Sequence, residues 1–149
     1  MALNKDWREF IELLNAEKVD YLIVGASAMA LHGIARLTGD IDFLIRPNRE
    51  TAEKVVQVLK KFGFASLGVE PEHFLKPDSF VQLGYVPRRI DIMNTISGVS
   101  FEEAWESRVS VMMEDLPVYV LDRPLLIRNK RAVGRPKDLL DLRILEEHE

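Results

Sequence analysis

Short strand-like runs alternate with helix-like stretches along the chain, and this alternation restricts the possible folds more than any other sequence feature. Tyr21–Val24 and Asp40–Ile45 are β-rich runs followed by glycine or proline, which is typical of strands. Residues 80–86 and Arg89–Met93 predict two further strands joined by a tight turn, and residues 118–121 predict a last one. The sequence thus predicts a set of short strands separated by other elements.

The stretches between these runs have helical character. Apolar residues recur at helical spacing from Trp7 to Leu14, and Asn48 and Ser100 stand where helix N-caps are expected. Further helices are predicted over residues 27–32, closed by Gly33, and from about residues 124 and 136. Helices interspersed with strands, including a hairpin, predict an α/β (α+β) fold with a short mixed sheet flanked by helices.

Size and composition agree with one ordinary folded domain. The chain has 149 residues, of which 47% are hydrophobic and 30% charged, with a formal net charge of −4. We expect a single domain over residues 1–149, with a core at about 20–122 and a helical segment at about 123–149. The lack of cysteine excludes a disulfide scaffold, a thiolate metal site and a cysteine nucleophile.

The sequence predicts neither a membrane span nor a signal peptide. The longest stretch without Asp, Glu, Lys or Arg covers residues 21–35, which is shorter than the ~20 apolar residues of a span. Charged residues at positions 5, 6 and 8 stand where a signal peptide would begin its apolar region. We therefore expect a cytoplasmic protein without a membrane partner.

Positive charge is concentrated near the C-terminus. Residues 123–137 include six basic side chains and no acidic one, whereas acidic residues gather just before them, at 102–106 and 114–115. Such a strip suits a small polyanion, for example the phosphates of a nucleotide, or one stem of RNA. On charge alone, a solvated helix face is the favoured interpretation.

The pair Asp40 and Asp42 is the most informative feature for chemistry. Because side chains alternate along a strand, both carboxylates point to one face while Ile41 points to the other. Crowded carboxylates raise each other's pKa unless a cation neutralises them, and Mg²⁺ prefers such oxygen ligands. Asp91 lies in a second predicted strand. If that strand pairs beside the first, three carboxylates meet, as a two-metal phosphoryl-transfer site requires.

Two interpretations of these acids stay open on the pattern alone. The aspartates could simply be exposed on the polar face of a half-buried strand. The functional interpretation is supported by residues 24–27, Val-Gly-Ala-Ser, where small residues before a helix would let a phosphate approach the backbone. The same small residues could also be a turn that serves packing. The turn is neither a Walker loop nor a dinucleotide-binding Gly-x-Gly-x-x-Gly motif.

Taken together, these motifs resemble the nucleotidyltransferase superfamily that includes DNA polymerase beta. Its signature is a Gly-Gly/Ser turn, a spacer, Asp-x-Asp and a third acid on a later strand, matched here by Gly25-Ala-Ser27, Asp40-Ile-Asp42 and Asp91. Within the superfamily the chain is most similar to the small bacterial AbiEii-like branch, whose toxin members occur in toxin–antitoxin pairs. The C-terminal Lys…Arg-x-Lys-Asp motif of that branch is matched by Lys130, Arg135, Lys137 and Asp138.

The resemblance implies a role for each matched residue. Asp40, Asp42 and Asp91 would be catalytic and would hold two Mg²⁺ ions, with Asp91 as third ligand or base. The nucleoside triphosphate (NTP) would be bound by Gly25, Ser27, Arg36, Thr38, Lys130 and Lys137, with Asp138 orienting the lysines. The implied reaction moves a nucleoside monophosphate from an NTP to a hydroxyl of an RNA such as tRNA, of a protein or of a small molecule. A partner protein or a homodimer could complete the cleft.

Alternatives stay open for the function and for the roles of several residues. Antibiotic-modifying nucleotidyltransferases share the same Gly…Asp-x-Asp plan, and a degenerate domain that only binds a nucleotide or partner is compatible with Ala26, where the superfamily often has glycine. Arg88 and Arg89 could offset the carboxylates or be charges of a hairpin turn, and the second interpretation is favoured. The three histidines are too scattered for a zinc site.

Overall fold

A single mixed sheet forms the centre of the molecule. The computed structural model describes residues 3–34 and 38–147, and within them six strands pair in the order β3-β4-β2-β1-β6-β5. β2 runs parallel to β4 and β1 parallel to β6, whereas the pairs β1–β2, β3–β4 and β5–β6 are antiparallel. The expected α/β fold with a mixed sheet is thus confirmed. The strands are β1 (Tyr21–Val24), β2 (Asp40–Ile45), β3 (Phe80–Leu83), β4 (Arg89–Met93), β5 (Val109–Met113) and β6 (Leu116–Val120).

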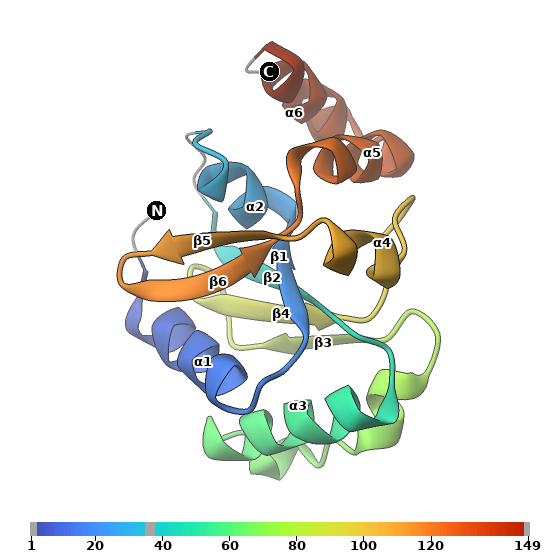
Figure 1. Cartoon of the computed structure of the whole chain (residues 1–149). Helices are drawn as coiled ribbons and strands as arrows, with labels where there is room; N and C mark the ends of the chain where they lie inside the picture. The colour runs from blue at the N-terminus through green and yellow to red at the C-terminus, as the bar shows by residue number, and fades with distance from the viewer. Residues whose placement is uncertain (1–2, 35–37, 148–149) are drawn as a thin grey trace.

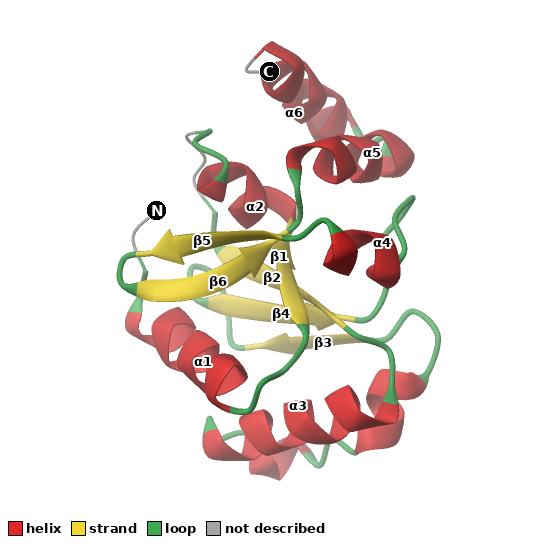
Figure 2. Ribbon diagram, in the orientation of Figure 1, coloured by secondary structure: helices red, strands yellow, loops and turns green. Residues whose placement is uncertain are grey.

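Helices cover both sides of this sheet. In Figure 1, α1 and α3 lie below the sheet, and α2, α5 and α6 lie above it; Figure 2 shows the strands between these two groups. Two short 3₁₀ helices, η1 (Ala65–Leu67) and η2 (Pro71–Leu75), follow α3. The α-helices are α1 (Lys5–Ala16), α2 (Gly25–Leu31), α3 (Arg49–Lys61), α4 (Phe101–Glu106), α5 (Arg123–Val133) and α6 (Pro136–Glu147).

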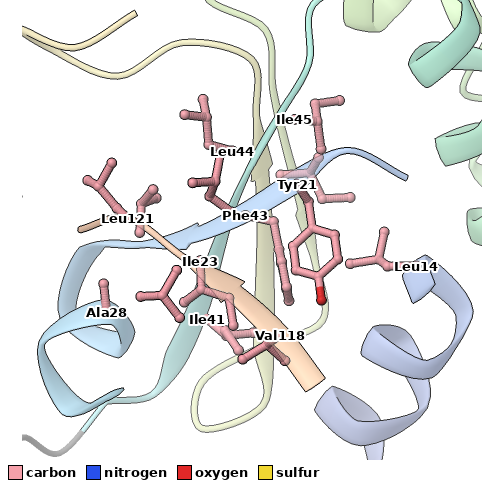
Figure 3. Close-up of a cluster of buried hydrophobic side chains, with 14 of the residues drawn as sticks. Leu14, Tyr21, Ile23, Ala28, Ile41, Phe43, Leu44, Ile45, Val118 and Leu121 are labelled. Atoms are coloured by element: carbon pink, nitrogen blue, oxygen red, sulfur yellow. The ribbon is translucent and has the colours of Figure 1, made fainter. Parts of the chain in front are cut away.

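The apolar face of β2 packs on the α1 and α3 side. Ile41 and Phe43 are fully buried, and the Phe43 ring lies 5.3 Å from the ring of Phe10 on α1. Phe10 also contacts Phe62, at the end of α3, at 5.3 Å. Figure 3 shows Phe43 beside Tyr21 and Ile41 beside Ile23 in this cluster. Because strand side chains alternate, burial of this face turns Asp40 and Asp42 to the opposite one.

Several predicted helix starts carry the expected caps. Asn48 accepts a hydrogen bond from the backbone N of Thr51 at 2.8 Å, and Ser100 forms a reciprocal capping box with Glu103. Such caps satisfy backbone N–H groups that have no partner within the helix. The prediction of α3 and α4 from their first residues is therefore confirmed.

Several elements differ from the sequence expectation; β6, for example, spans Leu116–Val120, where residues 118–121 were predicted. β3 ends at Leu83 and not at residue 86, because Gly84 adopts φ = +72° and turns the chain, leaving Tyr85 88% exposed. α2 begins at Gly25, two residues before the predicted start. β5 was not predicted, although Val109 and Val111 alternate with Ser110 as in a strand; it pairs antiparallel with β6 at the edge of the sheet.

Among residues 3–34 and 38–147, no helix combines the length and apolar character required to cross a bilayer.

Candidate active site

The register between β2 and β4 brings the three predicted acids together. The two strands are parallel, with Asp42 opposite Asp91 and Asp40 opposite Arg89. Residues opposite each other in a sheet point to the same face. Carboxylate oxygens of Asp40, Asp42 and Asp91 lie within 4.8 Å of one another. The condition set by the sequence, that the second acidic strand pairs beside the first, is met.

Burial and mutual repulsion perturb these carboxylates. Burial, together with the charges of Asp40 and Asp91, raises the pKa of Asp42 to about 8. Asp91 is only 3% exposed, and burial raises its pKa as well, although a hydrogen bond from Arg89 opposes the shift. The cluster therefore holds more negative charge than its protein surroundings neutralise, which favours binding of a cation.

Arg89 supplies part of the missing positive charge. Its Nη2 donates to Asp40 Oδ2 at 2.8 Å and to Asp91 Oδ2 at 3.2 Å, and its Nε donates to Asp91 Oδ1 at 3.1 Å. The interpretation of Arg89 as a hairpin-turn charge is therefore wrong. The parallel register places Arg89 opposite Asp40, which strand alternation within β4 alone could not show. Arg88 is exposed in the preceding turn and donates through its backbone N to Tyr85 O.

The donor set of the cluster fits a hard divalent cation. All candidate ligand atoms are carboxylate oxygens, the ligands that Mg²⁺ prefers. Asp42 Oδ1 is buried and lacks a hydrogen-bond partner among the described residues. A buried oxygen without a donor is costly, and a bound cation would satisfy it. The cluster is thus chemically suited to magnesium.

Gly25 is required by the close approach of β1 to this cluster. Val24 lies opposite Asp42, so the chain must turn directly beside the Asp42 carboxylate. Gly25 does so with φ = +69°, and a Cβ at this position would lie 2.4 Å from Asp42 Oδ2. Both the backbone angle and the lack of space exclude a side chain here.

The other residues predicted to contact the nucleotide from this region surround Asp40. Ser27 is buried, and its hydroxyl donates to Asp40 O at 3.2 Å. The Thr38 hydroxyl also donates to Asp40 O and lies 3.4 Å from Asp40 Oδ1. Both hydroxyls therefore fix the start of β2. Arg36 lies outside the described residues.

A shallow pocket of about 230 Å³ adjoins the cluster at Asp42, the one cluster member in the described pocket wall. Its wall includes Gly25 and Asp42 on one side and Lys130 and Asp138 of the C-terminal helices on the other. Lys130 is 5% exposed, and its Nζ donates to Asp141 Oδ2 at 2.9 Å and lies 3.5 Å from Asp138 Oδ1. The expected contact between Lys130 and Asp138 is present, and it joins α5 to α6 at the pocket edge.

Arg135 is a pocket residue that was not among the predicted site residues. Its side chain is 59% exposed, donates to Asp138 Oδ2 at 2.7 Å and lines the same pocket. Burial alone would raise the pKa of Asp138, but the bond from Arg135 and the charge of Lys130 hold it below its usual value. The matched Arg-x-Lys-Asp motif contained the signal for Arg135. Lys137 is exposed in the first turn of α6 and is not part of the described pocket wall.

A larger cavity, of about 320 Å³, lies at the opposite end of the sheet. It is lined by residues at the starts of β1 and β6 and by Trp105 and Tyr119. Its one carboxylate, Asp20, accepts a hydrogen bond from Arg46 Nε at 2.7 Å. Converging acids that are only partly neutralised are thus found at the carboxyl end of β1, which makes that end the better candidate for chemistry.

Comparison with known structures shows the same fold in two other proteins. A candidate nucleotidyltransferase of Thermotoga maritima is similar over 95% of this chain and 91% of its own, with a TM-score of 0.61 and 18% identity. An antigenic nucleotidyltransferase-like protein of Paracoccidioides brasiliensis is similar over 91% of this chain and 71% of its own, with a TM-score of 0.52 and 17% identity. No curated protein matches the chain by sequence.

The sequence itself matches one family model over nearly its whole length. The model describes a nucleotidyltransferase of unknown function (DUF6036), and the match covers residues 2–146. The carboxylate cluster and its pocket lie within the matched range. This chain therefore belongs to that nucleotidyltransferase family.

Proposed function

We propose that this protein transfers a nucleoside monophosphate from an NTP to a hydroxyl group and releases pyrophosphate. The observation that carries the proposal is the convergence of Asp40, Asp42 and Asp91 beside a pocket whose wall includes Gly25 and two basic residues. Family membership supports the same reaction class. The acceptor is an RNA such as tRNA, a protein or a small molecule.

Asp40, Asp42 and Asp91 would hold the metal in this proposal, with two Mg²⁺ ions expected. Magnesium, when bound, offsets triphosphate charge and lowers the pKa of the attacking hydroxyl. The unpartnered Asp42 Oδ1 and the raised pKa of Asp42 support its assignment as a ligand. Asp91, which is nearly buried, is the third ligand or the base that accepts the hydroxyl proton.

The remaining pocket residues would bind and orient the triphosphate. Gly25 lets the backbone pass directly beside the Asp42 carboxylate at the pocket wall, where its own N–H could meet a phosphate, and Ser27 and Thr38 hold the Asp40 backbone in place. Arg36, Lys130 and Lys137 are proposed phosphate or acceptor contacts. Arg135 is proposed as a further phosphate contact, because it lines the same pocket.

The reaction itself needs no covalent protein intermediate. The acceptor oxygen attacks the α-phosphorus, the bond from that phosphorus to the pyrophosphate oxygen breaks, and the hydroxyl proton leaves to a base. Catalysis in such a transfer depends mainly on positioning and on charge neutralisation. The cluster and the basic pocket edge supply these two requirements.

Label transfer from each of the four NTPs tests this function. The protein is incubated with Mg²⁺, NTP labelled at the α-phosphate, and a mixture of small RNA and cell extract. We expect label on one acceptor class with the wild-type protein and none with Asp42→Asn. If both proteins are folded and bind NTP but neither transfers label, the chain is a binding module and the proposal is wrong.

A toxin–antitoxin role is the finer form of the proposal. It is supported by the similarity of the motifs to the AbiEii-like bacterial branch, and a cytoplasmic location follows from the use of NTP. In this role the partner would be an antitoxin protein. Induced expression in bacteria is expected to arrest growth with the wild-type protein and not with Asp42→Asn; equal growth of both would contradict the toxin role.

A further inference from the structure

The positively charged guanidinium of Arg89 lies within the carboxylate cluster, where a metal ion would otherwise bind. Its guanidinium makes three hydrogen bonds, one to Asp40 and two to Asp91, at 2.8–3.2 Å. Both carboxylate oxygens of Asp91 and one of Asp40 are thereby engaged. Asp42, the third member, receives no bond from Arg89 and keeps a buried oxygen without a partner.

These oxygens cannot serve the guanidinium and a shared metal ion equally well. A divalent ion bound by the cluster needs carboxylate oxygens from its members, and Arg89 already uses three of them. A guanidinium and a divalent cation at adjacent positions also repel each other strongly in a partly buried site. The Arg89 side chain is 30% exposed and lies next to the hairpin turn, so it has an open side toward which it can move.

We propose that Arg89 is the resident counter-ion of the carboxylate cluster, and that a divalent cation binds there by displacing its guanidinium from Asp40 and Asp91. This inference rests on the cluster being the metal site of the proposed function. It adds that the metal-free site is held together by Arg89 and that metal affinity is lowered by this competition. Arg89 thereby sets the metal concentration at which the site fills.

Metal titration without nucleotide tests the competition. Mn²⁺ binding is measured by electron paramagnetic resonance for the wild-type protein, Arg89→Gln and Arg88→Gln. We expect Arg89→Gln to bind Mn²⁺ about tenfold more tightly, because a competing positive charge is removed. Arg88→Gln is the matched control, since it removes the same charge from the adjacent turn position and should leave the affinity within about twofold of the wild type.

Three results of this titration would overturn the inference. Equal affinity in the wild type and Arg89→Gln would show that Arg89 does not compete. Weaker binding in Arg89→Gln would show that Arg89 supports the metal site. Lack of Mn²⁺ binding by all three proteins would contradict it as well.

A measurement on the wild-type protein covers the case in which Arg89→Gln does not fold. The Nε–H resonance of Arg89 is followed by NMR during a Mg²⁺ titration, and we expect it to shift and lose its protection from exchange as the bonds to Asp91 break. An unchanged resonance at saturating Mg²⁺ would overturn the inference. Because neither measurement uses nucleotide, a protein that transfers no label could still show the displacement, and an active enzyme could still fail to show it.

Discussion

At the scale of single residues, the Asp42 carboxylate lies so close to Gly25 that a side chain at position 25 would collide with it. Gly25 and Gly68 have nearly the same backbone angle, φ = +69° and +66°, but a Cβ at Gly68 would meet nothing within 4 Å. We expect both Gly25→Ala and Gly68→Ala to lose about 1–2 kcal/mol of stability from the left-handed backbone, and Gly25→Ala to lose more because its Cβ meets Asp42. Only Gly25→Ala should also weaken divalent-metal binding, because its methyl group displaces the Asp42 carboxylate. Chemical denaturation and Mn²⁺ titration measure the two effects; unchanged metal binding in Gly25→Ala would contradict the account.

The raised pKa of Asp42 predicts a pH-dependent cost to stability in metal-free protein. The folded state keeps the Asp42 proton up to about pH 8, whereas the unfolded chain releases it near pH 4. Over this window the folded state binds more protons, so its stability falls as the pH rises, by at most about 1.4 kcal/mol per pH unit from this group. Asp42→Asn removes the cost.

Denaturation in EDTA at several pH values checks this prediction. The stability advantage of Asp42→Asn over the wild-type protein is expected to grow from pH 5 to pH 8. Since Asp40, Asp91 and Arg89 are kept in the variant, the difference reports the titration of Asp42 together with its influence on these neighbours. A pH-independent difference between the two proteins would contradict the shifted pKa.

At the scale of elements, a buried ion cluster joins α5 to α6. Lys130 is paired with Asp141 and Asp138, all three being nearly inaccessible. Removing one partner of a buried pair leaves uncompensated charge, so Lys130→Met should lower the free energy of unfolding by about 3–5 kcal/mol. The matched variant Arg131→Met removes an exposed pair with Glu146 and should cost less than about 1 kcal/mol. Urea denaturation of both variants measures these values; equal losses would contradict the structural role of Lys130.

The elements were largely predictable, because their signals are local. The cap at Asn48 and the alternation over Asp40–Ile45 are patterns of neighbouring residues. The structure has a helix and a strand at the positions that these two patterns predict. β5 was missed although it has a local signal as well, since its five residues, Val-Ser-Val-Met-Met, are mostly apolar and β-branched at two alternate positions. The early end of β3 depends on the positive φ of Gly84, which the residue type permits but does not dictate.

The site was predictable only in part, because its contacts join distant segments. Alternation predicts that Asp40 and Asp42 share a face, but that Asp91 lies opposite Asp42 depends on the register between β2 and β4. The same register places Arg89 on Asp40, where the sequence favoured a turn charge. Arg135 had a local signal, since its bond to Asp138 lies within the Arg-x-Lys-Asp motif, but its place in the same pocket wall as Asp42 depends on contacts between distant segments.

At the scale of the whole molecule, a filled metal site should stabilise the fold. A ligand that binds only the folded state adds free energy of unfolding, about 2.7 kcal/mol when its concentration is 100 times its dissociation constant. We expect Mg²⁺ at that ratio to stabilise the wild-type protein and not Asp42→Asn. Asp115→Asn, which changes an exposed turn carboxylate paired with Arg8, should respond like the wild type. Denaturation with Mg²⁺ or EDTA measures this; equal stabilisation of all three would place the metal elsewhere.

The fold and the family show the class of protein, while the proposed chemistry rests on three carboxylates that the sheet register brings together. Both structural relatives share less than a fifth of their residues with this chain, so their likeness supports the fold alone. The carboxylate cluster is the observation on which the proposed phosphoryl transfer depends. The decisive test must therefore identify which phosphate moves and whether the cluster is needed.

Parallel reactions with NTP labelled at the α- or the γ-phosphate test this most directly. With Mg²⁺ present, the account predicts that the α-label appears on an acceptor while the γ-label appears in pyrophosphate, and that EDTA or Asp42→Asn abolishes both. Movement of the γ-label onto an acceptor would show a different phosphoryl transfer. Transfer of the α-label by Asp42→Asn at the wild-type rate would show that the carboxylate cluster is not the active site.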